Sequence, residues 1–108
     1  MSDDVKAPGK ETVCQEADRL VTDDRQSVYG SPWNNFSLAS DIITPMLRTK
    51  LKDGVKLEPE DIAFFMIGLK LARELNKHKR DSIVDAIGYL KCLDLVVEER
   101  SKIEEKKK

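Results

Sequence analysis

The chain has 108 residues, the size of one domain, and its formal net charge is −1 although 36% of its residues are charged. This balance argues against binding of double-stranded nucleic acid through bulk electrostatics. No apolar run approaches the roughly 20 residues of a membrane span, and the polar start of the chain does not resemble a signal peptide. We therefore expect a cytoplasmic protein that does not enter a membrane.

Residues 1–10 show no periodicity and are predicted to form a flexible arm, with a single helical domain over residues 11–100. A first helix is predicted over residues 11–22, where Val13, Ala17 and Val21 recur at helical spacing. Thr12 and Gln15 fit the capping-box pattern at its start.

The second helix is predicted from Pro32 towards residue 48, with Ser31 as its N-cap. Pro45 removes a backbone hydrogen bond and should kink this helix or end it near Ile43. The expected buried stripe comprises Trp33, Phe36, Ala39, Ile43 and Met46 or Leu47.

The third helix is predicted over residues 59–75, because Pro59 suits a first helical position and Glu60 and Asp61 complement the helix dipole. Its expected buried stripe comprises Ile62, Phe65, Met66, Leu69, Ala72 and Leu75. A basic connection over residues 77–80 follows.

The fourth helix is predicted from Asp81, as a cap, to about residue 98 or beyond, and the charged tail 101–108 should fray. Ile83, Ile87, Leu90 and Leu93 or Val97 should face the core. No segment alternates as a strand would, so we predict an all-α fold, a compact bundle of about four helices. A domain of this size has a small core, and we expect a homo-oligomer.

Two segments before and at the start of the second helix suggest ligand binding. Arg25 could clamp a phosphate, and Tyr29 could stack on a base, although a structured loop would explain both residues as well. Trp33 could likewise stack on a base or belong to the core, and Asn35 could bond a base edge or a neighbouring helix.

Cations and carboxylates later in the chain indicate the same chemistry. Lys70 and Arg73 are neighbours on one helix face and could bind phosphate, as could Arg80, or they could form a solvated face. Asp81 and Asp85 lie one helical turn apart, a spacing that suits Mg²⁺, with Asp61 as a weaker third candidate. The alternative is that Asp81 caps the helix and Asp85 pairs with a cation of the third helix.

Two further residue types complete the candidates. Gly88 inside a predicted helix needs a reason, which close helix packing or ligand approach would supply. Cys14 and Cys92 share no metal-ligand spacing and are expected to be reduced and buried.

The motifs together resemble a known family. The order E-A-x-x-L-V-x-x-D-R-x-x-x-Y-G-x-P-x-x-N-F, then P-E-D-I-A and K-x-A-R, then K-R-D-S-x-V-D-x-x-G-Y over residues 16–91 resembles a small helical domain of unknown function that is common in tailed bacteriophages and prophages. More distantly, the chain is similar to a phage family associated with nucleotide modification and to the MazG-like all-α pyrophosphatases, which hold Mg²⁺ with acidic residues.

The resemblance implies a phage-type protein that acts in the bacterial cytoplasm and binds a nucleotide or other phosphate-bearing molecule. Three functions stay open: Mg²⁺-dependent nucleotide pyrophosphohydrolysis, sequestering of a host nucleotide signal without catalysis, and interaction with a host protein. Whether the chain is an enzyme is left open, because its carboxylate spacing departs from the E-E-x-x-E and E-x-x-D pattern of the pyrophosphatases.

Overall fold

The computed structural model describes residues 10–26 and 30–107, without the side chains of Asp24 and Arg25. Most of the predicted N-terminal arm therefore lies outside the described residues. The elements, in chain order, are α1 (Val13–Arg19), the π-helix η2 (Leu20–Arg25), α3 (Pro32–Met46), the 3₁₀ turn η3 (Arg48–Lys50), α4 (Pro59–Asn76) and α5 (Arg80–Lys106). No strand occurs in these ranges, which confirms the all-α prediction of four helices packed together.

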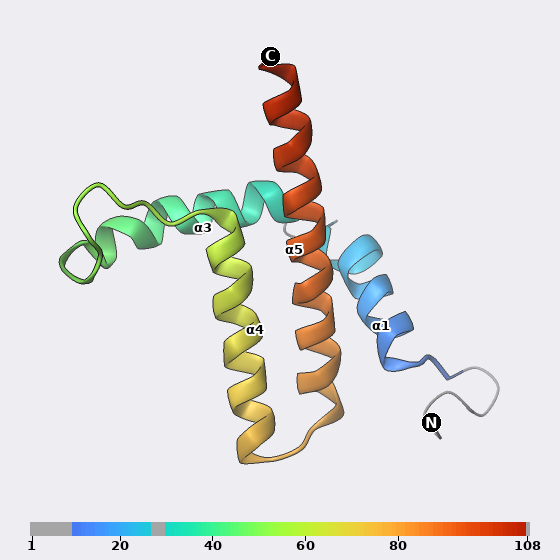
Figure 1. Cartoon of the computed structure of the whole chain (residues 1–108). Coiled ribbons are helices and arrows are strands. Elements are labelled where there is room, and N and C mark those ends of the chain that lie inside the picture. The colour runs from blue at the N-terminus through green and yellow to red at the C-terminus, as the bar shows by residue number, and fades with distance from the viewer. Residues whose placement is uncertain (1–9, 27–29, 108) are drawn as a thin grey trace.

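The α4–α5 hairpin forms the centre of the structure (Figure 1). Its two helices run antiparallel, α3 crosses one end of the hairpin, and α1 lies against α5 on the side away from α4. The C-terminal turns of α5 project beyond α3. No helix in the described part of the chain is long and apolar enough to cross a membrane.

Three helix starts follow the predicted capping chemistry. Thr12 and Gln15 exchange two hydrogen bonds, of 2.8 and 3.0 Å, which confirms the capping box of α1. The Ser31 hydroxyl accepts a bond from the Asn34 amide at 3.2 Å at the start of α3. Pro59 occupies the first turn of α4, where the Asp61 carboxylate accepts a 2.9 Å bond from the Glu58 amide.

The helix boundaries differ from the prediction at three points. The first predicted helix changes from α to π geometry at Leu20. α3 ends at Met46, two residues short of the predicted end near residue 48, and it does not stop near Ile43 as in the alternative. α5 begins at Arg80 with Lys79 as its N-cap, so Asp81 lies in the first turn and is not the cap, and the helix continues to Lys106.

The core lies where α3 meets the hairpin. Its buried residues are Phe36, Ile62, Ala63 and Val96, and the partly buried side chains packed against them are Trp33, Ala39, Ile43, Tyr89, Cys92 and Leu93. A second buried group, Ala17, Val21 and Val84, lies where α1 and η2 cover α5.

Several side chains predicted to be buried are exposed instead: Phe65, Leu69, Ala72, Leu75, Leu90 and Cys14. Of the two pairs predicted as alternatives, Leu47 and Leu93 are partly buried, and Met46 and Val97 are exposed. The reason is that α4 packs on one side only, with Ile62 and Ala63 as its buried apolar contacts, whereas its apolar residues extend around the helix. When apolar residues surround a helix, their periodicity in the sequence does not determine which face packs against the other helices.

Candidate functional site

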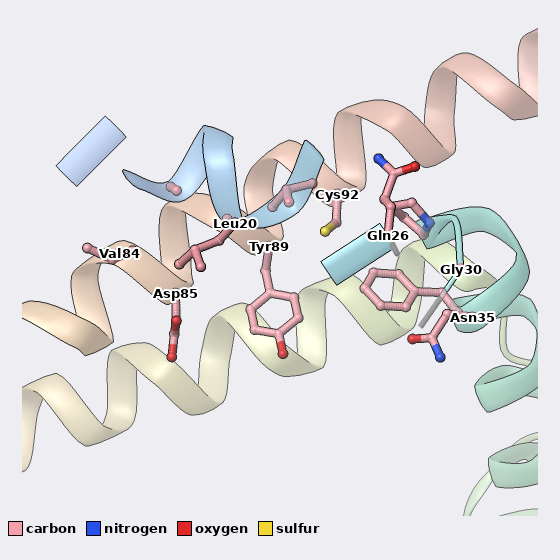
Figure 2. A pocket seen from close by; sticks show the side chains of 13 residues that line it. Leu20, Gln26, Gly30, Asn35, Val84, Asp85, Tyr89 and Cys92 are labelled. Atoms are coloured by element: carbon pink, nitrogen blue, oxygen red, sulfur yellow. The ribbon is translucent and has the colours of Figure 1, made fainter. Parts of the chain in front are cut away.

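A cavity of about 330 Å³ lies between η2, the start of α3 and α5 (Figure 2). This volume is at the lower end of the range of small-molecule sites. The wall is mainly apolar, with Ala17, Leu20, Val21, Gln26, Gly30, Pro32, Asn35, Phe36, Val84, Asp85, Gly88, Tyr89 and Cys92 as its lining residues.

Four polar side chains interrupt the apolar wall. Gln26 and Asn35 come from opposite sides of the loop that precedes α3, and Asp85 and Tyr89 project from the same side of α5 (Figure 2). The Tyr89 ring stacks on Phe36, with 6.3 Å between ring centroids and 29° between planes. An apolar cavity with few convergent polar groups is the usual form of a binding site for an organic molecule.

Gly88 of α5 lies at the cavity wall, where η2 packs against α5. A β-carbon added at this position would lie 3.4 Å from Cγ2 of Val21, so η2 passes close over α5 at this point. The helices are therefore in close contact here, as one of the two explanations expected from the sequence has it, although 3.4 Å is an ordinary van der Waals distance that an alanine would also meet. Gly30, with a φ of 83°, occupies the left-handed region at the cavity edge.

A second concavity, an open groove of about 660 Å³, lies between the last turn of α4 and the first turns of α5. Four cations line it: Lys70, Arg73, Lys77 and Lys79. Its other lining residues are Ala72, Asn76, Asp81, Ser82 and Asp85. The groove is lined by four positive and two negative side chains, so its net charge is positive.

Lys70 and Asp85 form an ion pair at the boundary between the two concavities. The Lys70 Nζ and Asp85 Oδ2 atoms lie 3.0 Å apart, and the side chains are only 14% and 20% exposed. Asp85 lines both the cavity and the groove. The pairing agrees with the alternative expected from the sequence, in which Asp85 meets a cation of the third helix.

The structure separates the predicted ligand-binding residues into groups. Asn35 lines the cavity, and Lys70 and Arg73 line the groove. Trp33 lines neither concavity: it packs on the core, with the Arg100 guanidinium 5.3 Å from its ring centroid. The side chain of Arg25 and all of Tyr29 lie outside the described residues.

Arg80, predicted to bind phosphate, lines neither concavity. Its guanidinium contacts the N-terminal part of α1 instead. Its Nη2 donates a 3.0 Å hydrogen bond to the Glu11 carbonyl, and its Nη1 pairs with the Glu16 carboxylate. These contacts fasten the start of α1 to the start of α5.

The three carboxylates predicted for a metal do not share one place. Asp81 and Asp85 both line the groove, whereas Asp61 caps the opposite end of α4. Within residues 10–26 and 30–107, no group of three or more His, Cys, Asp or Glu side chains is placed to hold a metal ion. Lys77 and Lys79 are groove residues that the sequence reasoning assigned only to a basic connection; their spacing from Arg73 was the available signal.

Comparison with known proteins supplies the family. A family model described as "Domain of unknown function (DUF6378)" matches residues 12–97, a range that includes the cavity and the groove. The chain belongs to this family. The resemblance to a phage domain of unknown function is thereby confirmed, and the DUF6378 match carries no statement of activity.

Two phage proteins are similar to this DUF6378 chain. The "Gene 55 protein" of Mycobacterium phage D29 is 32% identical over 90 residues, which are 82% of this chain and 56% of that protein. The "Gene 55 protein" of Mycobacterium phage L5 is 31% identical over 84 residues, which are 77% of this chain and 51% of that protein. The chain thus spans about half the length of these relatives. No solved structure matches it.

Proposed function

We propose that this chain binds a small phosphate-bearing molecule of nucleotide type, with the phosphates in the cationic groove and the organic part in the apolar cavity. The observation that carries the proposal is the shared wall: Asp85 lines both concavities. A ligand that spans them needs an apolar part joined to an anionic part, which is the chemistry of a nucleotide.

The groove supplies the charge for the phosphate end. Arg73, Lys77 and Lys79 are exposed there, and Lys70 is largely buried against Asp85. Arginine and lysine donors form charge-assisted hydrogen bonds with phosphate oxygens. A phosphate bound in the groove would also compete with the Asp85 carboxylate for Lys70. Because Asp85 also lines the cavity, phosphate binding would change the charge environment of the cavity wall.

The cavity supplies contacts for the organic end. The stacked Phe36 and Tyr89 rings give an aromatic surface, and the Asn35 amide and Gln26 amide offer both donors and acceptors. These groups suit a heterocycle with hydrogen-bonding edges.

We propose holding of the ligand, rather than its hydrolysis, as the primary function. The Asp85 carboxylate is already paired with Lys70, so it is not poised as an isolated base or metal ligand. Mg²⁺ still fits as a companion of the ligand, because it is commonly bound through one or two carboxylates together with phosphates, and Asp81 and Asp85 line the groove. The phage relatives support a role inside the bacterial host, such as sequestering a host nucleotide signal.

The test is depletion of a mixed nucleotide pool by the purified protein, with and without Mg²⁺. Each nucleotide is quantified by mass spectrometry in solution and again after heat denaturation of the protein. A species that disappears and returns intact supports holding; a smaller phosphate product would show hydrolysis instead. If no nucleotide is depleted, the proposed function is wrong.

A matched pair of variants localises the binding. Arg73→Gln removes a groove cation and should weaken binding of the depleted nucleotide about tenfold or more, by loss of a charged hydrogen bond. Lys102→Gln removes a cation on the exposed surface of α5, where it lies 3.9 Å from Glu98, and should leave the affinity unchanged. Equal effects of both would indicate binding outside the groove.

A further inference from the structure

The outer face of α4 carries an apolar stripe that no other part of the described chain covers. Phe64, Leu71 and Leu75 are 56%, 53% and 90% exposed, and Phe65 and Leu69 beside them are exposed as well. Single exposed apolar residues are ordinary on a protein surface, whereas a contiguous patch marks an interaction site.

The stripe lies on the opposite side of α4 from the core. Phe64, Gly68, Leu71 and Leu75 follow i, i+4, i+7 and i+11, so they form one line along the helix. The buried residues Ile62 and Ala63 face α3 and α5. A helix that is apolar on both sides is typical of a helix with neighbours on both sides.

Gly68 stands in the middle of this line, and its environment sets it apart from Gly88. Nothing lies within 4 Å of a β-carbon built at Gly68, so no contact within the described chain requires a glycine there. Glycine in a helix interior is less favourable than alanine and is expected where another backbone approaches closely. A helix from outside the described chain that packs closely at Gly68 would supply such a reason.

We propose that a second copy of this chain packs its own α4 antiparallel against this stripe, with a two-fold axis near Gly68. A two-fold interface must be self-complementary, and in antiparallel order Phe64 of one copy faces residue 72 of the other across the axis. Gly68 is close to the middle of the 18-residue helix, so the two helices would overlap along nearly their whole length.

Charge favours this occupant and this direction. The exposed acidic residue Glu58 stands at the start of α4, where Arg100 binds Glu60 and Asp61 caps the helix, and the exposed basic residues Lys77 and Lys79 follow the end of the helix. In an antiparallel pair each acidic end lies beside the partner's basic end, and the helix dipoles oppose each other. A parallel pair would place like charges together.

The size of the stripe suits the centre of a dimer interface. At about 150–250 Å² for a full aromatic side chain, the two half-exposed phenylalanines alone offer roughly 200 Å². Leu71 and Leu75, both more than half exposed, bring the stripe to the few hundred Å² of the largest apolar patch on a typical monomer, which is often functional. A stable interface of about 800 Å² per partner then requires only a polar rim from the ends of α4.

The proposed dimer does not depend on the proposed ligand, although the two surfaces share residues. Lys70 and Arg73 lie on the side of α4 that faces α5, whereas Ala72, which faces Phe64 of the partner, and the basic residues Lys77 and Lys79 also line the groove. The mass of the protein without ligand and the depletion of nucleotides test the two proposals separately.

The first experiment is sedimentation equilibrium of the full chain without ligand, where twice the chain mass is expected. The double variant Leu71→Glu/Leu75→Glu should halve that mass while far-UV circular dichroism stays unchanged. The control Leu38→Glu/Ile42→Glu makes the same change on the exposed apolar face of α3 and should remain dimeric. A monomeric wild type, or a dimer broken only by the α3 variant, would overturn the proposal.

The second experiment determines direction by disulfide formation in a chain with Cys14 and Cys92 replaced by serine. Phe64 of one copy faces residue 72 of the other, so the double variant Phe64→Cys/Ala72→Cys should cross-link under mild oxidation. Phe64→Cys alone should not, since it would lie roughly 12 Å from its counterpart at 1.5 Å per residue. Efficient cross-linking of the single variant would indicate a parallel pair and would contradict the proposed geometry.

Discussion

Arg100 holds the Glu60 carboxylate through two contacts, Nε–Oε2 at 2.5 Å and Nη2–Oε1 at 2.8 Å, while its guanidinium lies 5.3 Å from the centroid of the Trp33 ring. One side chain of α5 thereby joins the first turns of α3 and α4. Such a paired geometry is stronger than a single exposed ion pair because both guanidinium donors are matched.

Glu60→Gln should lower the free energy of unfolding by about 1–2 kcal/mol near neutral pH, because it removes a charge-assisted, partly buried pair. The donors of Arg100 hold the pKa of Glu60 below its ordinary value of 4.5. A carboxylate with a lowered folded pKa stabilises the fold above its unfolded pKa, and this contribution is lost as the pH falls through the folded pKa. The difference between wild type and variant in urea unfolding should therefore shrink below pH 4.5.

Glu98→Gln is the control for this pair, since Glu98 lies 3.9 Å from Lys102 on an exposed part of the same helix. Its effect should stay within about 0.5 kcal/mol. If both variants lose the same free energy of unfolding, the loss comes from the removal of a negative charge and not from the paired contact with Arg100.

Arg80→Gln should loosen α1 without unfolding the hairpin. The substitution removes the bond to the Glu11 carbonyl and the pair with Glu16, which fasten α1 to α5. Amide hydrogen exchange should accelerate in Val13–Arg19 and remain unchanged in α4. Uniform acceleration in both helices would contradict this local role.

Thr44→Val should destabilise the fold by about 1–3 kcal/mol, because it leaves a buried donor without a partner. The Thr44 hydroxyl donates to the Ser40 carbonyl at 2.7 Å and accepts from the Leu57 amide at 3.0 Å, which ties the loop before α4 to α3. Thr44→Ser keeps both bonds and should retain more of the stability. The urea concentrations at the unfolding midpoint of the two variants test this difference in stability. Equal midpoints would contradict the stabilising role of the hydroxyl.

Gly88→Ala should be tolerated, because the added β-carbon meets Val21 at 3.4 Å and alanine favours a helix by about 1 kcal/mol. Gly88→Leu should instead force η2 away from α5 and cost about 1–3 kcal/mol through overpacking. Thermal unfolding of both variants measures this difference. If Gly88→Ala lowers the melting temperature as much as Gly88→Leu, the space between Gly88 and Val21 cannot accommodate even a β-carbon.

Much of the local structure was predictable because it depends on neighbours in sequence. The capping box of Thr12 and Gln15, the Ser31 cap and the Pro59 start all involve residues within one turn, so their chemistry can be read directly from the chain. The shared side of Asp85 and Tyr89 likewise follows from helical periodicity.

Contacts between distant residues were not predictable in the same way. Glu60 and Arg100 lie far apart in the sequence, as do Glu16 and Arg80, so their spacing does not predict that either pair is in contact. The buried stripe of α4 was predicted correctly at Ile62 and wrongly at Phe65, Leu69, Ala72 and Leu75. Its apolar positions surround the helix, and only the placement of α3 and α5 selects the buried side. The cationic groove was predicted in part, through Lys70 and Arg73. Lys77 follows Arg73 by about one helical turn and could have been added, whereas Lys79 joins the groove because the chain turns back into α5.

The position of Trp33 gives the chain a built-in optical reporter. It is the single tryptophan, and it lies beside Arg100 at the end of the hairpin opposite to the groove. Its emission therefore follows the junction of α3, α4 and α5 and is remote from bound phosphate. Inorganic phosphate that shifts this fluorescence from the groove would have transmitted a change along the length of the hairpin, whereas phosphate that leaves it unchanged would have left that junction undisturbed.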